Sequence, residues 1–204
     1  MTADFPAPKL MGDPTENRIR KEADQTRKVW LGSVYAETFQ PSHVMFVDSD
    51  DCISCNLVAY VDRHRQSNGW YIEQGFEYPS RGHIIYPKSK FYTKCGTSNI
   101  IRYDLLKPLL RDDPGTLGPN HYPIYIRHKA QRSYFAKAGN PLSPLPFPGA
   151  IYITEHGDNT FLEYFSRKQK NLLDLTRVYG GKLRKRMVAQ PITREIREEF
   201  GLWV

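Results

Sequence analysis

The chain has 204 residues, of which 40% are hydrophobic and 25% are charged, and its formal net charge is +7. This length suits one domain with a sizeable core, and the composition is that of a globular protein rather than a disordered chain or a coiled coil. No apolar run approaches the ~20 residues that span a bilayer, and the N-terminus has no apolar signal segment. Three cysteines do not make a disulfide framework. We therefore expect a cytoplasmic protein with reduced thiols and no membrane contact.

The first 28 residues predict an N-terminal arm. Residues 1–14 contain prolines and no periodicity, which indicates a flexible segment. Residues 15–29 are highly charged, and the pairs Glu16–Arg20 and Asp24–Lys28 have the i,i+4 spacing that supports a helix. This part is expected to be a short solvated helix, or an arm that orders only against a partner.

Residues 29–154 predict a β-rich region. Alternating or β-branched runs favour strands over residues 30–35, 43–47, 52–63, 70–73, 82–86, 90–94, 122–128 and 150–154. Asn68-Gly69 suits the tight turn of a hairpin between two of these strands. Residues 99–110 predict a short helix that Pro108 ends or kinks, and the prolines of residues 139–149 predict an extended segment.

The C-terminus predicts helices over residues 160–204. Thr160 and Glu163 have the spacing of a capping box, apolar residues then recur at helical spacing, and Gly180-Gly181 is a natural stop. A second helix is expected to end near Phe200, before Gly201. The predicted fold is α+β, with one domain over residues 29–204. Its mainly antiparallel sheet or small barrel packs against the C-terminal helices.

Positive charge is concentrated in the same region. Residues 166–197 hold ten basic residues against two acids, a local charge of +8 that exceeds the net charge of the whole chain. Cations packed this densely repel one another unless phosphates or an acidic protein surface neutralise them. The alternative is a merely solvated basic face. The residues expected to bind nucleic acid are Arg167, Lys168, Arg177, Lys170, Lys182, Arg184, Lys185 and Arg186.

Two clusters could hold a metal ion, although neither has a complete ligand signature. Cys52 and Cys55 have zinc-ligand spacing, and Cys95 and His64 could complete a set, but a second paired knuckle is missing. The acids of residues 48–51 could bind a divalent ion, but they lack the pattern of a calcium loop and suit a turn. Glu155 to Asp158 gathers acids and a histidine where acids at a helix start are expected anyway. We expect no bound metal, no cofactor and no catalytic residue.

Aromatic residues are frequent and alternate with cations in places. Gly69-Trp70-Tyr71 and the Lys90–Lys94 run resemble the stacking platforms that bind unpaired bases. Tyrosine is equally favoured in protein interfaces, so this pattern does not discriminate between the two functions.

Three functions therefore remain open. The leading hypothesis is a binding and assembly protein, not an enzyme, whose cationic C-terminal segment contacts nucleic acid. The second is a structural subunit of a large assembly such as a virus particle, or of a homo-oligomer. The N-terminal arm and the proline-rich segment would then contact neighbouring subunits. The third is a metal-dependent hydrolase or nuclease built on the Asp48–Asp51 cluster and histidines.

Overall fold

The computed structural model describes residues 7–9, 12–80, 82–113, 127–154 and 188–202. The helices are α1 (Pro14–Ala36), α2 (Asn56–Arg63), α3 (Tyr103–Leu106), α6 (His128–Lys137) and α9 (Arg194–Phe200). Short 3-10 helices are η1 (Glu37–Phe39), η2 (Phe91–Thr93) and η3 (Lys107–Leu110). The strands are β1 (His43–Met45), β2 (Cys52–Ile53), β3 (Gly69–Tyr71), β4 (Gln74–Tyr78), β5 (Ile84–Ser89), β6 (Asn99–Arg102), β7 (Ser143–Pro144), β8 (Ala150–Ile153) and β9 (Gln190–Pro191).

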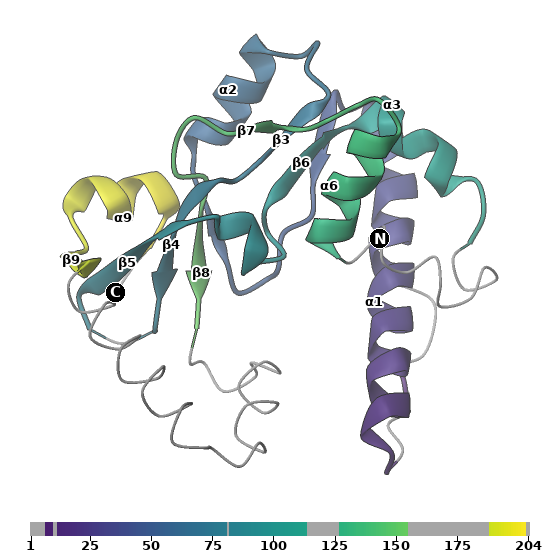
Figure 1. Ribbon diagram of the computed structural model, residues 1–204, viewed down its shortest axis with the longest axis horizontal. Helices are drawn as coiled ribbons and strands as arrows, with labels where there is room; N and C mark the ends of the chain where they lie inside the picture. Colours follow the sequence, from purple (N-terminus) through teal and green to yellow (C-terminus); the bar gives the residue numbers. More distant parts are fainter. Residues whose placement is uncertain (1–6, 10–11, 81, 114–126, 155–187, 203–204) are drawn as a thin grey trace.

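The strands form two mixed sheets, which confirms the predicted α+β class. The first sheet has the order β1-β6-β3-β7 and the second has the order β2-β8-β4-β5-β9 (Figure 1). Within the described residues most pairings are antiparallel, and the exceptions are β3 with β7 and β4 with β8. Helix α9 confirms the predicted C-terminal helix. It ends at Phe200, and Gly201 takes the left-handed conformation there with a φ of 61°.

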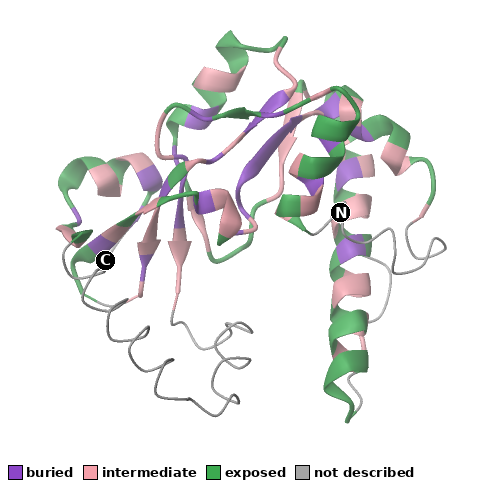
Figure 2. Cartoon of the chain, viewed as in Figure 1, coloured by how far each residue is buried: buried purple, intermediate pink, exposed green. Residues whose placement is uncertain are grey.

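Consecutive residues of the first sheet point to opposite faces, so that both faces are buried. Ile100 packs with α2 and η2 around Trp70 and Phe91, whereas Ile101 packs on the other face with Phe135 of α6. This is the two-residue period of a strand. The second sheet buries Tyr78, Ile85 and Ile151 beneath Phe200 of α9. Burial is accordingly concentrated along the strands, while α1 alternates between exposed and half-buried positions and buries only Thr26 and Ser33 (Figure 2).

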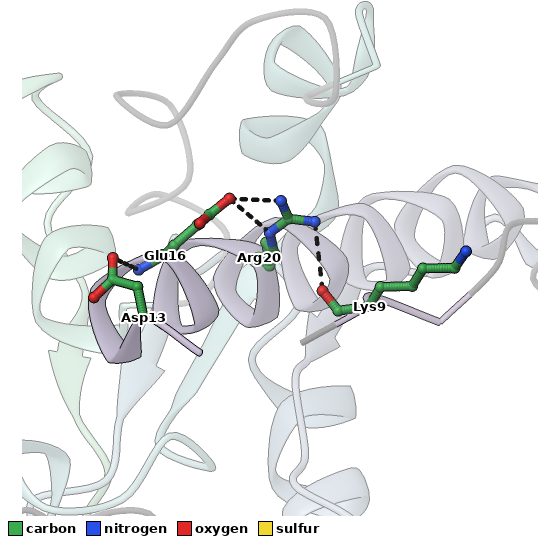
Figure 3. Close-up of polar contacts among 4 residues, drawn as sticks. All are labelled: Lys9, Asp13, Glu16 and Arg20. Carbon is green, nitrogen blue, oxygen red and sulfur yellow. Dashed lines mark hydrogen bonds and ion pairs between the residues drawn. The ribbon is translucent and has the colours of Figure 1, made fainter. Parts of the chain in front are cut away.

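Helix α1 begins at a well-formed cap. The Asp13 carboxylate accepts hydrogen bonds from the backbone N–H groups of Thr15 and Glu16, and Arg20 links Glu16 to the carbonyl oxygen of Lys9 (Figure 3). The two bonds to Asp13 satisfy backbone N–H groups that have no partner within the helix. The predicted pair of Arg20 with Glu16 is confirmed, as is that of Lys28 with Asp24, 2.7 Å apart.

The predicted strand over residues 30–35 is wrong, because α1 continues through it to Ala36. Tertiary contacts hold these last turns. Trp30 donates its indole N–H to the carbonyl oxygen of Leu110, and Tyr103 donates its hydroxyl to the carbonyl oxygen of Ser33, 2.8 Å away. The β-forming side chains of this stretch are therefore overruled by contacts with residues far along the chain.

The predicted strand over residues 52–63 is also wrong beyond Ile53, since Asn56–Arg63 is helix α2. Leu57, Tyr60 and Val61 meet the core together, which is the i, i+3, i+4 spacing of a helix, while Val58 is 78% exposed. Leu57 and Val61 also fit an alternating pattern, so the sequence was compatible with both periods.

The predicted hairpin at Asn68-Gly69 fails with that strand, and this dipeptide instead leads from α2 into β3. Gly69 has a φ of +124°, and a Cβ there would overlap the carbonyl oxygen of Ile100 on the paired strand β6. Glycine is therefore required by the close approach of two backbones, rather than by a hairpin turn.

Other predicted elements are confirmed in part. Strands β1 and β8 lie within predicted strands, residues 139–149 contain the short strand β7 and no helix, and β5 overlaps the strand predicted over residues 82–86. Residues 99–102 are strand β6 instead of helix, which begins only at Tyr103, and residues 91–93 form η2 instead of a strand. Strand β9 follows the strand predicted to be the last. The strand over residues 122–128 falls outside the described residues except at its end, where His128 begins α6.

Helix α6 and strand β4 were not predicted. Helix α6 buries only Gln131 and Phe135, so its apolar periodicity is weak. The helix predicted from Thr160 to Tyr179 lies outside the described residues. Within the described part, no helix combines the length and apolar character needed to cross a membrane.

Candidate functional site

The cationic segment is defined here as residues 166–186, which contain all eight residues predicted to bind nucleic acid. The segment lies outside the described residues, but the strands that precede and follow it are described. At one end, Thr154 donates its backbone N–H to the carbonyl oxygen of Tyr78, 2.7 Å away. At the other end, β9 pairs with β5 through Ile85 and Gln190.

Both flanking strands belong to the second sheet, where β4 and β5 lie between β8 and β9. Adjacent strands are ~4.8 Å apart, which places β8 and β9 roughly 14 Å from each other. The last strand described before the cationic segment and the first one described after it therefore belong to the same sheet.

Helix α9 does not extend the positive region, although Arg194 and Arg197 lie on it. Arg194 donates to the Glu198 carboxylate at 2.6 Å, and Glu195 and Glu199 add further negative charge to the same helix. The basic stretch was counted from residue 166 to Arg197, but from Arg194 onward its positive charges are neutralised by the glutamates of α9. The unbalanced part is the cationic segment itself.

One arginine and two tyrosine rings form a cluster in the described part of the chain. The guanidinium carbon of Arg132 is 4.2 Å from the ring centre of Tyr71 and 4.0 Å from that of Tyr92. The two rings meet edge to face with their centres 5.0 Å apart. They come from β3, η2 and α6, and all three side chains are half-buried. Tyr71 and Tyr92 belong to the two aromatic runs predicted from the sequence, whereas Arg132 was missed because α6 was not predicted.

The acidic residues 48–51 form a turn, as predicted. The Asp51 N–H donates to the Asp48 carbonyl oxygen at 3.1 Å, and the Asp48 N–H donates to the Thr97 hydroxyl at 2.9 Å. The Asp51 carboxylate accepts hydrogen bonds from the Cys95 thiol and the Ile153 N–H, at 3.0 and 3.3 Å. Burial raises the pKa of Asp51, and these hydrogen bonds oppose the rise. Asp51 therefore anchors the turn to strand β8.

The cysteines and the histidine that were considered as zinc ligands differ in burial and in their contacts. Cys95 is buried against Asp51, and burial together with that charge raises the pKa of its thiol. His64 donates its Nδ1–H to the carbonyl oxygen of Tyr60, 2.7 Å away. Cys55 is exposed and Cys52 is half-buried. Among the described residues, no three His, Cys, Asp or Glu side chains gather in a way that could hold a metal ion.

A small polar pocket lies between α1 and α6. It has a volume of about 100 Å³, and its polar lining includes Gln25, Asp48, Asn99, His128 and Gln131. Burial raises the pKa of Asp48, and the charges of Asp51 and Asp50 add to that rise. Burial lowers the pKa of His128, and the charge of Lys129 adds to that effect. The pocket is therefore lined by an imidazole whose neutral form is favoured and by a carboxyl group that binds its proton more tightly than usual.

Asp48 was considered as a metal ligand from the sequence, but the pocket was not predicted. Its other polar residues are brought together only by α6, which packs beside α1 (Figure 1). No family model matches the sequence, and no curated protein or solved structure is significantly similar to it.

Proposed function

We propose that the protein binds nucleic acid, and that the cationic segment contacts the phosphates. The observation that carries this proposal is the charge of the segment. It holds eight basic residues and one acid, a charge of +7 that equals the net charge of the entire chain. The rest of the protein is therefore neutral overall, and the field that attracts a polyanion comes from this one segment.

One feature of the described part supports the proposal. Arg132 keeps its guanidinium on the rings of Tyr71 and Tyr92, and a stacked guanidinium can contact an unpaired base as well as a phosphate. We expect binding to be mainly electrostatic and to discriminate little between sequences.

Salt dependence provides the test. The logarithm of affinity should fall with the logarithm of salt concentration by about 0.9 per phosphate contact on duplex DNA and about 0.7 on single strands. Replacing Lys185 and Arg186 together by Ala should flatten this slope by roughly one to two units, with little change in Tm. Fluorescence anisotropy at five salt concentrations, on duplex and single-stranded probes of several sequences, measures it.

A matched control removes two charges elsewhere. Arg18 and Lys21 are exposed on α1, so the double change to Ala alters net charge equally but leaves the cationic segment intact. Its salt slope should stay within about half a unit of the parent. If the Lys185 and Arg186 variant binds as tightly as the parent at every salt concentration, the proposal is wrong.

A second candidate function is that of an assembly subunit, which one observation favours. Phe39 is 70% exposed and Tyr35 is 43% exposed, with their ring centres 5.4 Å apart at the end of α1. Exposed aromatic pairs are typical of protein interfaces. Under this hypothesis, Phe39→Ala should lower the sedimentation coefficient of the purified protein. A monomer before and after the change would remove this support.

A further inference from the structure

One residue that lines the pocket between α1 and α6 has a buried amide oxygen with no hydrogen-bond donor in the described part. Asn99, at the start of β6, is only 2% exposed. Its Nδ2 group donates to the carbonyl oxygen of His128 at 2.9 Å and to Oε1 of Gln131 at 2.8 Å. Both N–H bonds of the amide are thus used, and this fixes which end of the side chain is oxygen. That oxygen has no partner within the described part.

An unpaired buried acceptor is costly, on the order of 1–3 kcal/mol, and such groups are uncommon in folded proteins. Here a second one accompanies it, because the buried Nε2 of His128 also has no partner in the described part. Both atoms belong to residues that line the same pocket. Two such groups in one cavity point to a ligand that satisfies both.

The third polar group is the Asp48 carboxylate, which brings negative charge to the pocket. It lies against Gly96, where a Cβ would come within 2.7 Å of Oδ2. Glycine at this position therefore lets the carboxylate approach the backbone closely. Burial lowers the pKa of His128, which favours the neutral imidazole at pH 7.5, so the ring itself adds no positive charge beside the carboxylate. The lining thus offers a carboxylate, an amide oxygen and an imidazole nitrogen, together with apolar surface from Val29 and Phe46.

We propose that this pocket binds the head group of a small organic cation that carries N–H donors, such as a guanidinium or a primary ammonium. The volume of about 100 Å³ decides the size of the ligand. One water takes ~30 Å³ of liquid, and a cavity of ~150 Å³ accepts benzene, so the pocket holds only a few heavy atoms. Pockets for larger ligands measure roughly 300–1,000 Å³, which excludes a nucleotide. The site is therefore distinct from the proposed nucleic-acid contact.

The experiment is an NMR titration of the full chain, with isotope-labelled His and Asn side chains. The probes are methylguanidinium and ethylammonium chloride at constant ionic strength and pH 7.5. Signals of the His128 ring and the Asn99 amide should shift and saturate, with Kd on the order of 1–10 mM for so few atoms. Tetramethylammonium has the same charge but no N–H donor, and should cause no saturable shift.

Two variants distinguish a specific binding site from non-specific attraction of cations by the acidic turn. Asp48→Asn keeps the size of the side chain and should weaken methylguanidinium binding about tenfold or more, because a charge-assisted hydrogen bond is lost. Asp50→Asn removes an equal charge from the same turn at a residue that does not line the pocket, and should weaken binding less than threefold. Circular dichroism of both variants checks that the fold is retained.

Several outcomes would overturn the proposal. Equal losses in the two variants would mean that only the local field attracts cations. Saturable binding of tetramethylammonium would show that the N–H donors are irrelevant. Displacement of methylguanidinium by micromolar Mg²⁺ or Zn²⁺ would identify a metal site instead. The absence of any saturable shift up to 100 mM probe would mean that the pocket is merely hydrated.

Discussion

Truncating Phe135 to Ala tests the element on which both the pocket and the Arg132 cluster depend. Phe135 is 1% exposed and packs with Ile101, Leu106 and Leu142, so it fixes α6 to the first sheet. Removing a fully buried phenyl ring costs ~3–5 kcal/mol through lost transfer energy and the cavity left behind. Domains of this kind have roughly 5–15 kcal/mol of total stability. The change therefore removes about a third or more of the free energy of unfolding in a typical case.

Urea unfolding followed by circular dichroism measures this loss directly. For a chain of 150–250 residues, each 1 kcal/mol corresponds to ~2–4 °C in Tm, so a decrease of roughly 6–20 °C is expected. The neighbouring change Tyr134→Ala is the control, because Tyr134 is 43% exposed. It should cost less than ~1 kcal/mol. If the two variants are equally destabilised, the phase assigned to α6 is wrong, and the positions of His128 and Arg132 are wrong with it.

Two further predictions concern acid and backbone strain. Burial keeps the pKa of His128 below its usual 6.5, so the unfolded chain takes up a proton as the pH falls below that value while the folded protein does not. The free energy of unfolding should therefore fall between pH 7.5 and pH 6, and His128→Gln should make the fall smaller. An unchanged slope in the variant would contradict this cause. Gly69→Ala should cost at least ~2 kcal/mol, because the positive φ and the Ile100 carbonyl oxygen both oppose a Cβ. Gly82→Ala, with a φ of +79° but open space around the Cβ, should cost only ~1 kcal/mol in the same melting experiment, and equal costs would rule out the backbone clash.

The candidate sites differ in how far the sequence could reveal them. The cationic segment is a matter of composition, so counting charges is enough to find it. The pocket is not, because Asp48, Asn99 and His128 are far apart in the chain and no spacing rule connects them. Arg132 shows the same limit, since its two tyrosine partners come from β3 and η2. Only packing of α6 against the sheet brings these side chains together.

The sequence by itself determined the features that depend on local chemistry. These are the α+β class, the ion pairs of α1, the turn at residues 48–51 and the helix stop at Gly201. Each rests on side chains that act within a few residues of one another. Local rules therefore suffice for them.

The tertiary structure decided the remaining elements, because long-range contacts outweighed weak local preferences. Residues 30–35 remain helical because Trp30 and Ser33 bond with residues about 70–80 positions away. Leu57 and Val61 fit both a strand and a helix, and packing against Trp70 and Phe91 selects the helix. Intrinsic preferences differ by less than about 1 kcal/mol per residue, whereas burying one large side chain gains ~1.5–3 kcal/mol. Where the two conflict, the core decides the conformation.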